Sequence, residues 1–290
     1  MVIPQQPSHS EPAYRNPTFD SFNVAAERQI GRYGDKPFLT WYDDHRDERI
    51  ELSYRTFDNW VAKTANLLVD ELGAEPGDRV GAALVDHWQT PVVLAACWRA
   101  GMGVVAIDPA SPDRPTDSFA AAFVREEFLD ATAAALDQTT VVALTADLPG
   151  RGSHDLGRAL SYARVVPSMG DVFQGGPDPG DALTAGGETA TMAGLLERAA
   201  ALADRTGLGD GDRLLSNRPL LTVRGAAAGL VAPFLGGAGV VLARPFDPAR
   251  FWKRVADERV TVAVLEPGQA AAVGDAGPAV DSRLRVLLDD

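Results

Sequence analysis

Cysteine and lysine are both scarce in this chain, and each scarcity excludes a class of protein. Its 290 residues include one cysteine, Cys97, so no internal disulfide can form. Cys97 lies in the apolar run VVLAACWRA, which favours a buried structural thiol over a nucleophile. The only lysines are Lys36, Lys63 and Lys253. With a formal net charge of −13 and no basic cluster, the chain also lacks a surface for nucleic acid.

Targeting and membrane signals are lacking as well. The N-terminus MVIPQQPSHSEP has neither the basic nor the apolar region of a secretion signal. Residues 225–243 carry no charge over a length that could cross a bilayer, but five glycines and Pro233 favour a buried helix, a turn and a buried strand. We therefore expect a soluble, cytoplasmic protein with no membrane partner.

Catalytic and metal-binding signatures are equally sparse. No GxSxG, GxxxxGK[ST] or GxGxxG motif occurs in a fitting context, and the consecutive Ser153, His154 and Asp155 cannot form a triad, whose members converge from separate segments. The four histidines lack metal-ligand spacing, so no metal site is expected; they are His9, His45, His87 and His154.

The apolar pattern predicts an α/β fold. Residues 1–17, rich in Pro and Ser, are expected to be a loose arm, and PFLTWYDD a first strand. A helix from about 54 to 72 begins after the N-cap Ser53 and stops at Gly73. A strand (PGDRVGAALV), a helix (TPVVLAACWRAG) and a strand (GVVAIDP) follow. This β-α-β order builds parallel sheets.

The middle of the chain is expected to connect two lobes. The segment 111–140 is predicted to be helical in its middle part, and 141–147 to be a buried strand. Glycine and proline throughout 148–180 mark a connector. The expected organisation is therefore a first α/β lobe at 18–147 and a second at 181–290.

Two parts of the chain resemble each other. ELGAEPGDRVGAAL is similar to RTGLGDGDRLLSNR, and RAGMGVVAIDPASPDR to LGGAGVVLARPFDPAR. Gly73 then corresponds to Gly207, and Gly101 to Gly237, at a nearly constant offset. This pattern favours two related β-α-β units, against the alternative of a chance likeness.

These strings also resemble a known family. Residues 52–109, beginning LSYRTFDNW and containing PGDRVGAALV, are similar to the opening of the AMP-forming acyl-CoA synthetases, the adenylate-forming enzymes. The run from GLGDGDRLL to VTVAVLEPG resembles that family's next segment, and SRLRVLLDD its following strand. The resemblance covers about residues 35–290 and implies the α/β fold of the synthetases' N-terminal domain, in two similar lobes.

The family's phosphate loop, [ST]SGTTGxPKG, corresponds here to LTAGGETATMAG. Such loops need glycines for close backbone approach, hydroxyls, and a lysine for charge. Here the lysine is absent, and Glu188 adds a negative charge. Losing two charge-assisted contacts corresponds to a loss of about 10²- to 10⁴-fold in phosphate affinity. The resemblance thus implies a degenerate loop that keeps only Thr184, Gly186, Gly187, Thr189 and Thr191.

Other family parts are also missing from this sequence. The aromatic-His pair beside the family's acyl site is replaced by Leu221 and Thr222, with Arg224 as a new charge. The adenine site, the Mg²⁺-binding Glu and the C-terminal domain with its catalytic lysine have no counterpart before Asp290. Since adenylation needs alignment, metal and lysine together, we expect no catalytic residues, no cofactor and at most weak ATP or AMP binding.

One place remains for a ligand. Asp86 and His87 follow a strand, and open α/β sheets bind ligands at the carboxyl ends of their strands. With Thr222 and Arg224 they form the candidate cleft. The alternative for His87 is a solvated surface role.

Three functions remain open at this point. The chain is a non-catalytic acyl-CoA synthetase-like domain that binds a ligand or partner, a half-enzyme completed by another chain, or a structural dimerisation module. A homodimer or a hetero-complex through the second lobe is expected, because its charge-free segment 225–243 would leave apolar surface exposed.

Overall fold

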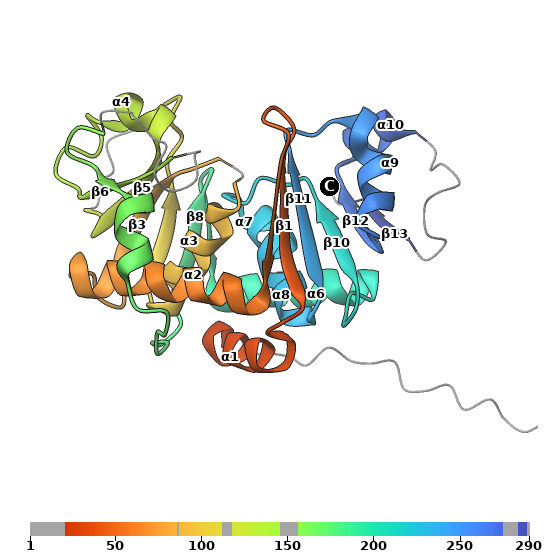
Figure 1. Cartoon of the computed structure of the whole chain (residues 1–290), viewed down its shortest axis with the longest axis horizontal. Coiled ribbons are helices and arrows are strands. Elements are labelled where there is room, and N and C mark those ends of the chain that lie inside the picture. Colours follow the sequence, from red (N-terminus) through yellow and green to blue (C-terminus); the bar gives the residue numbers. More distant parts are fainter. Residues whose placement is uncertain (1–20, 86, 112–117, 146–155, 275–283, 289–290) are drawn as a thin grey trace, which may run out of the picture.

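The structure is a computed structural model that describes residues 21–85, 87–111, 118–145, 156–274 and 284–288. The expected arm at 1–17, the candidate Asp86 and the run from Ser153 to Asp155 lie outside the described residues. The described chain forms two sheets with helices between them (Figure 1), which confirms the α/β fold with mainly parallel sheets.

The first sheet has seven strands in the order β7-β6-β5-β3-β4-β8-β9, with β8 and β9 antiparallel and the other described pairs parallel. Buried apolar residues run along its central strands, as expected for a sheet covered on both faces. The strands are β3 (Arg79–Ala83), β4 (Gly103–Ala106), β5 (Ala121–Arg125), β6 (Val141–Leu144), β7 (Leu160–Ser161), β8 (Asp181–Ala185) and β9 (Glu188–Thr191).

The second sheet has six strands in the order β13-β12-β10-β11-β1-β2, with β1 and β2 antiparallel and the other described pairs parallel. Residues 44–47 form the turn between β1 and β2. The strands are β1 (Pro37–Asp43), β2 (Glu48–Ser53), β10 (Arg213–Ser216), β11 (Gly239–Arg244), β12 (Val262–Leu265) and β13 (Arg285–Leu288).

Helices fill the space between the sheets and cover their outer faces (Figure 1). The largest cluster of buried apolar side chains joins α1, α2, α3, α6 and α8 to both sheets, and a smaller one packs α9 on the outer face of the second sheet. The helices are α1 (Phe22–Tyr33), α2 (Tyr54–Asn66), α3 (Gln89–Arg99), α4 (Leu129–Thr132), α5 (Tyr162–Val165), α6 (Met192–Thr206), α7 (Val223–Ala226), α8 (Ala232–Gly236), α9 (Pro248–Asp257) and α10 (Pro267–Val273).

The predicted repeat is present in the strand pairing. In one unit Arg79 aligns with Gly103 across β3 and β4, and in the other Arg213 aligns with Gly239 across β10 and β11. On the other side, β5 pairs with β3 as β12 pairs with β10. We call residues 37–125 the first unit and residues 181–265 the second unit. Strand order and register are the same in both.

The sheets do not follow the expected lobes at 18–147 and 181–290. The hairpin β1–β2 of the first unit joins the second unit's sheet beside β11, and the hairpin β8–β9 of the second unit joins the first unit's sheet beside β4. The second strands of the two β-α-β motifs are β4 and β11, and each has one edge that its own unit leaves unpaired. The hairpin of the other unit pairs with that edge, through β8 on β4 and through β1 on β11. The two units therefore form one interlocked structure.

Two local expectations have different outcomes. The middle of 111–140 was expected to be helical, but Ala121–Arg125 is the fully buried strand β5. The prediction is wrong for Ala121–Arg125, because alanine favours helix locally while the position between β3 and β6 imposes a strand. It is confirmed for the short helical turns Glu126–Phe128 and Leu129–Thr132 that follow. The charge-free segment 225–243 is a buried helical stretch, a left-handed Gly237 and the strand β11, as predicted. Among the described residues no helix is long and apolar enough to cross a membrane.

Candidate functional site

The expected phosphate loop is the tip of the hairpin β8–β9. Gly186 and Gly187 have φ values of +57° and +81°, and they connect Ala185 directly to its cross-strand partner Glu188. A two-residue connection with positive φ at both positions is a tight hairpin turn that suits glycine. Both glycines therefore fit the two central positions of this turn.

The hydroxyls of this hairpin already have partners within the chain. The Oγ1 atoms of Thr184 and Thr189 lie 3.0 Å apart across the two strands. Thr191 caps α6, since its Oγ1 accepts from the backbone N–H of Gly194 at 3.1 Å. At the tip, Arg198 pairs with Glu188 at 2.9 Å in an exposed ion pair. The five predicted loop residues are thus brought together, but in internal contacts.

A cleft of about 540 Å³ opens where the carboxyl ends of β1, β3 and β5 meet the segments that follow β10 and β11. The carboxyl edge of a parallel sheet is where α/β folds place their ligands. The walls combine apolar and ionisable side chains, and they are Trp41, Asp43, His45, Arg46, Leu84, Val85, His87, Arg125, Glu127, Pro219, Leu221 and Pro245.

His87, a predicted cleft residue, lies on this wall and is 4% exposed. Its ring meets that of Trp41 edge-on, with centroids 4.5 Å apart. Burial lowers the pKa of His87 well below its usual value, and the charges of Arg125 and Arg46 lower it further, which favours the neutral imidazole. Since Nδ1 accepts the backbone N–H of Gln89 at 3.3 Å, the ring hydrogen is on Nε2.

Arg125 is the cleft residue that sequence reasoning missed. It ends the buried strand β5 and is 5% exposed. Its Nη2 lies 3.5 Å from a carboxylate oxygen of Glu127, while its Nε and Nη1 are buried without a hydrogen-bond partner. The sequence feature that could have identified it is a single arginine at the end of the apolar run AAAFVR. Because this run was predicted to be helical, Arg125 was not recognised as the last residue of a strand.

The remaining predicted residues lie apart from the cleft wall. Thr222 caps α7: its Oγ1 accepts from the N–H of Gly225 at 3.0 Å and donates to the carbonyl of Pro219 at 2.7 Å. Arg224 is exposed on α7. Leu221, the residue before Thr222, lines the cleft. Among the described residues no group of three His, Cys, Asp or Glu side chains could hold a metal ion.

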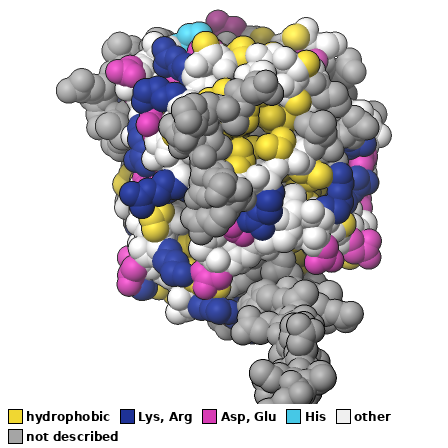
Figure 2. Space-filling view, turned by 90° about the vertical axis from the view of Figure 1, so that its right-hand side faces the viewer, with side chains coloured by type: hydrophobic (Ala, Val, Ile, Leu, Met, Phe, Trp, Pro, Cys, Tyr) yellow, Lys and Arg dark blue, Asp and Glu magenta, His cyan; other side chains and the backbone are white. Residues whose placement is uncertain are grey.

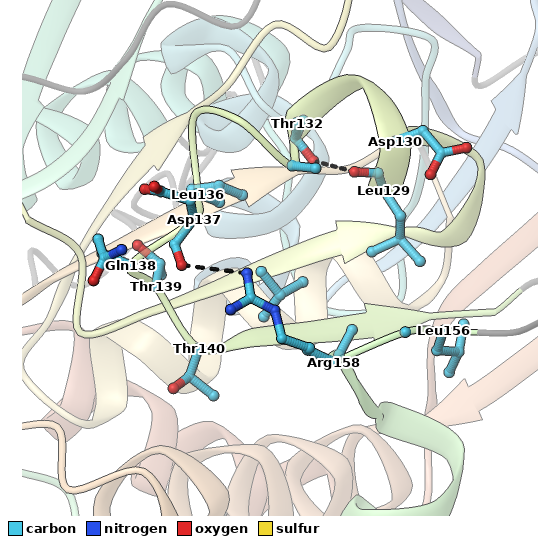
Figure 3. A pocket seen from close by; sticks show the side chains of 14 residues that line it. Leu129, Asp130, Thr132, Leu136, Asp137, Gln138, Thr139, Thr140, Leu156 and Arg158 are labelled. Carbon is cyan, nitrogen blue, oxygen red and sulfur yellow. Dashed lines mark hydrogen bonds between the residues drawn. The ribbon is translucent and has the colours of Figure 1, made fainter.

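A second, open groove of about 620 Å³ lies beside the starts of β6 and β7 (Figure 3). Its polar contacts are local ones: Arg158 donates to the carbonyl of Asp137 at 3.4 Å, and Thr132 to that of Phe128 at 2.8 Å. It lies at the amino ends of two parallel strands and brings no buried charge to one point. We therefore assign the candidate site to the cleft.

Comparison with known proteins agrees with this architecture. A family model described as AMP-binding enzyme matches residues 26–122. The chain is 36% identical over 229 residues to a TIGR03089 family protein of Mycobacterium tuberculosis, a match that covers 78% of this chain and 90% of that one. The chain belongs to the TIGR03089 family.

Solved structures show the same fold for this family member. The acyl-CoA synthetase of Brucella canis matches 93% of the chain with a TM-score of 0.77 and 19% identity. Apo MatB from Rhodopseudomonas palustris matches 86% with a TM-score of 0.67 and 20% identity. The chain covers only 53% and 50% of those two proteins, so it spans about half their length. It has the fold of an acyl-CoA synthetase over that half.

Proposed function

We propose that this chain is an acyl-CoA synthetase-like domain that binds a small ligand between its two sheets and does not form acyl-adenylates on its own. The observation that carries the proposal is the closed tip of the hairpin β8–β9. Gly186 and Gly187 form a tight turn, and the threonine hydroxyls beside them bond within the chain. A phosphate loop needs those same groups turned toward its ligand.

The charges at the tip support the same proposal. No lysine occurs between positions 64 and 252, and Glu188 occupies the turn together with its partner Arg198. Catalysis of phosphoryl chemistry depends on cations that neutralise developing charge. Here the local charges neutralise each other, so the tip offers no net attraction to a triphosphate.

The test is pyrophosphate release from ATP with a panel of carboxylic acids, with the acyl-CoA synthetase of Brucella canis as a positive control. We expect a rate equal to that without protein, while the control enzyme turns over. A clear rate above background that is lost with Gly186→Val would contradict the proposal, because it would show that the tip acts on ATP. Gly31→Ala, a glycine with open space around it, serves as the matched control variant.

A second candidate function is assembly through the outer edge of the second sheet. Among the described residues β13 pairs only with β12, and Val286 on β13 is 46% exposed. Figure 2 shows apolar side chains gathered on this face between charged ones. An edge strand with unpaired backbone groups is a template for another chain. We expect a homodimer or a stable hetero-complex, and light scattering across a hundredfold dilution contradicts this if the mass stays monomeric with no co-purifying partner.

A further inference from the structure

The two units of the chain hold each other through surfaces that a second copy of the chain also carries. Each hairpin completes the other unit's sheet, β1 on β11 and β8 on β4, and Figure 1 shows the red β1 beside the blue β11. We propose that the segment 169–180, which we call the strap, decides which units pair. At its full length it pairs the two units of one chain, and when it is too short, the units pair between two copies in an exchanged dimer.

The first argument is that the two junctions between the units are equivalent. β1 runs parallel to β11, with Leu39 aligned with Val240. β8 runs parallel to β4, with Leu183 aligned with Val104. These strand pairs contain no residue of the strap. They can therefore form within one chain or between two identical chains, which is the condition for domain exchange.

The second argument is that the strap is the one stretch of chain that leads from the first unit's sheet to β8. It contains neither helix nor strand. It begins after α5, which contacts β6 and β7, whereas β8 lies four positions away from β6 in the sheet. Four strand spacings are about 19 Å. The length of the strap thus decides whether β8 of the same chain can reach its place beside β4.

The third argument is the way in which the strap is held. Three side chains donate to its backbone carbonyls: Asn66 of α2 to Gly170 at 2.8 Å, Arg99 of α3 to Phe173 at 3.0 Å, and Asn23 of α1 to Gly176 at 2.8 Å. At its end, Asp178 accepts the backbone N–H of Phe22 at 2.7 Å and so caps α1. Val172 in the middle is 81% exposed. A segment held in this way can open locally while the strand pairs persist.

Pairing within one chain is favoured by proximity alone. A short flexible link gives an effective concentration in the millimolar range, which exceeds that of a dilute protein solution. Exchange makes the same junctions without this advantage, so the unmodified chain should be mainly monomeric with respect to exchange. In the exchanged dimer each cleft between the sheets is shared by two copies, because its lining includes Trp41 of the first unit and Leu221 of the second.

The experiment refolds a one-to-one mixture of two full-length variants that each add one cysteine, Val105→Cys and Thr184→Cys. These two residues are partners across β4 and β8, so a disulfide between the two chains requires an exchanged junction. Oxidation follows refolding, when the native Cys97 is buried. A mixture without the added cysteines controls for other covalent dimers.

The same mixture is made with a shortened strap and with a matched control. The shortened chain lacks residues 169–177, and the three strap residues that remain reach about 14 Å at full extension. That is less than the four strand spacings to be crossed. In the control, a flexible Gly-Ser segment of the original length replaces residues 169–177, which removes the anchored carbonyls but keeps the reach.

We expect the shortened chain to have twice the monomer mass and to form the interchain disulfide. With the wild-type strap and the control, the covalent dimer should be a minor species whose fraction rises about tenfold for a tenfold rise in protein concentration during refolding. A shortened chain that refolds as a monomer, or as a dimer without the disulfide, overturns the proposal.

If the shortened chain does not refold, the wild-type strap decides the question. The absence of any covalent dimer after refolding at millimolar protein concentration then overturns the proposal, because the advantage of the single chain is lost there. A dimer through β13 has no β4–β8 junction between chains, and the readout does not use adenylation. The result therefore stands apart from both tests of the proposed function.

Discussion

The hairpin β1–β2 of the first unit and the hairpin β8–β9 of the second occupy equivalent places, each at the edge of the other unit's sheet. Both lead into a helix capped by a hydroxyl: Ser53 accepts from the N–H of Thr56, and Thr191 from that of Gly194, both at 3.1 Å. The backbone plan is therefore the same, down to the first turn of the following helix.

The side chains that hold the two hairpins are different. The first hairpin is tied to the α9 region, where Glu258 receives hydrogen bonds from Tyr42 and, at 2.8 Å, from Arg49. Arg254 of α9 also pairs with Asp44 in the turn at 2.7 Å. The second hairpin has one exposed pair at its tip, Glu188 with Arg198. The fold thus keeps the position of a hairpin through backbone pairing, while the charges around its tip are free to differ.

The largest effects on stability should come from two equivalent glycines, one just before β4 in the first unit and one just before β11 in the second unit. Gly101 and Gly237 have φ values of +77° and +71°. A Cβ on Gly101 would lie 2.9 Å from the carbonyl oxygen of Pro177, and one on Gly237 would collide with the ring of Tyr33. We expect each alanine variant to lower the free energy of unfolding by about 2–5 kcal/mol, since left-handed strain and overpacking add. Urea unfolding measures it.

The matched controls are the glycines that follow the helical stretch 54–72 in the first unit and α6 in the second unit. Gly73 and Gly207 also have positive φ, but an added Cβ on Gly73 meets nothing within 4 Å, and one on Gly207 meets only the flexible end of Arg285. Their alanine variants should cost about 1–2 kcal/mol, from strain alone. Equal losses at all four positions would show that crowding does not distinguish these sites.

The next largest effect on stability is expected at Glu258, which holds the first hairpin and not the second. The side chain of Glu258 is 5% exposed and lies between Arg49 and Arg213, which are 42% and 21% exposed. Glu258→Ala removes the more buried of the two carboxylates that Arg49 and Arg213 share, the other being Glu51. We expect a loss of about 2 kcal/mol, below that of a fully buried pair. At the second hairpin, the ion pair found among the described residues is the exposed one between Glu188 and Arg198. A loss below that of an exposed ion pair would mean that the network does not hold the first hairpin.

The carboxylate of Glu258 should also make the free energy of unfolding depend on pH in the acid range. Burial opposes the charge of Glu258, but hydrogen bonds from Arg49 and Tyr42 and the charge of Arg213 outweigh it, so its pKa lies below its ordinary value of 4.5. A lowered pKa stabilises the fold above pH 4.5, and this contribution is lost as the pH falls through the folded value. Wild type should therefore lose more stability than Glu258→Gln between neutral pH and the folded pKa, and parallel curves would contradict this.

Much of the fold was predictable from local residues. Ser53 and Gly73 mark the ends of the helical stretch 54–72, and the repeated GDR and GVV strings locate the β-α-β units, because caps and turns act within a few residues. The pairing of β1 with β11 was not predictable, since it depends on a free edge formed about 200 residues later. The alanine-rich β5 was misread for the same reason, and the cleft residue Arg125 was lost with it.

Loss of either helix cap should lower the free energy of unfolding by the same amount, as expected if the two units are equivalent. Ser53 caps α2 and Thr191 caps α6, each through one hydrogen bond from a backbone N–H. Replacement of either by alanine leaves that donor unpaired and should cost about 1 kcal/mol. Chemical denaturation of Ser53→Ala and Thr191→Ala compares them directly. A much larger loss at Thr191 would show that this hydroxyl serves the hairpin beyond its cap.

The smallest effect is expected at the tip of the second hairpin. Glu188 and Arg198 are each 49% exposed, and exposed ion pairs contribute about 0–1 kcal/mol. Glu188→Gln should therefore leave the free energy of unfolding nearly unchanged, in contrast to Glu258→Gln at the first hairpin. Glu188→Lys should also fold, with a slightly lower stability because the new cation faces Arg198.

Glu188→Lys further tests what a restored cation at this position can do. Since Gly186 and Gly187 close a tight turn and the hydroxyls of Thr184 and Thr189 pair with each other, we expect no gain in ATP affinity from the charge alone. Calorimetry with ATP compares Glu188→Lys with Glu188→Gln. A gain of tenfold or more, about 1.4 kcal/mol, would show that charge rather than backbone closure separates this hairpin from a working phosphate loop.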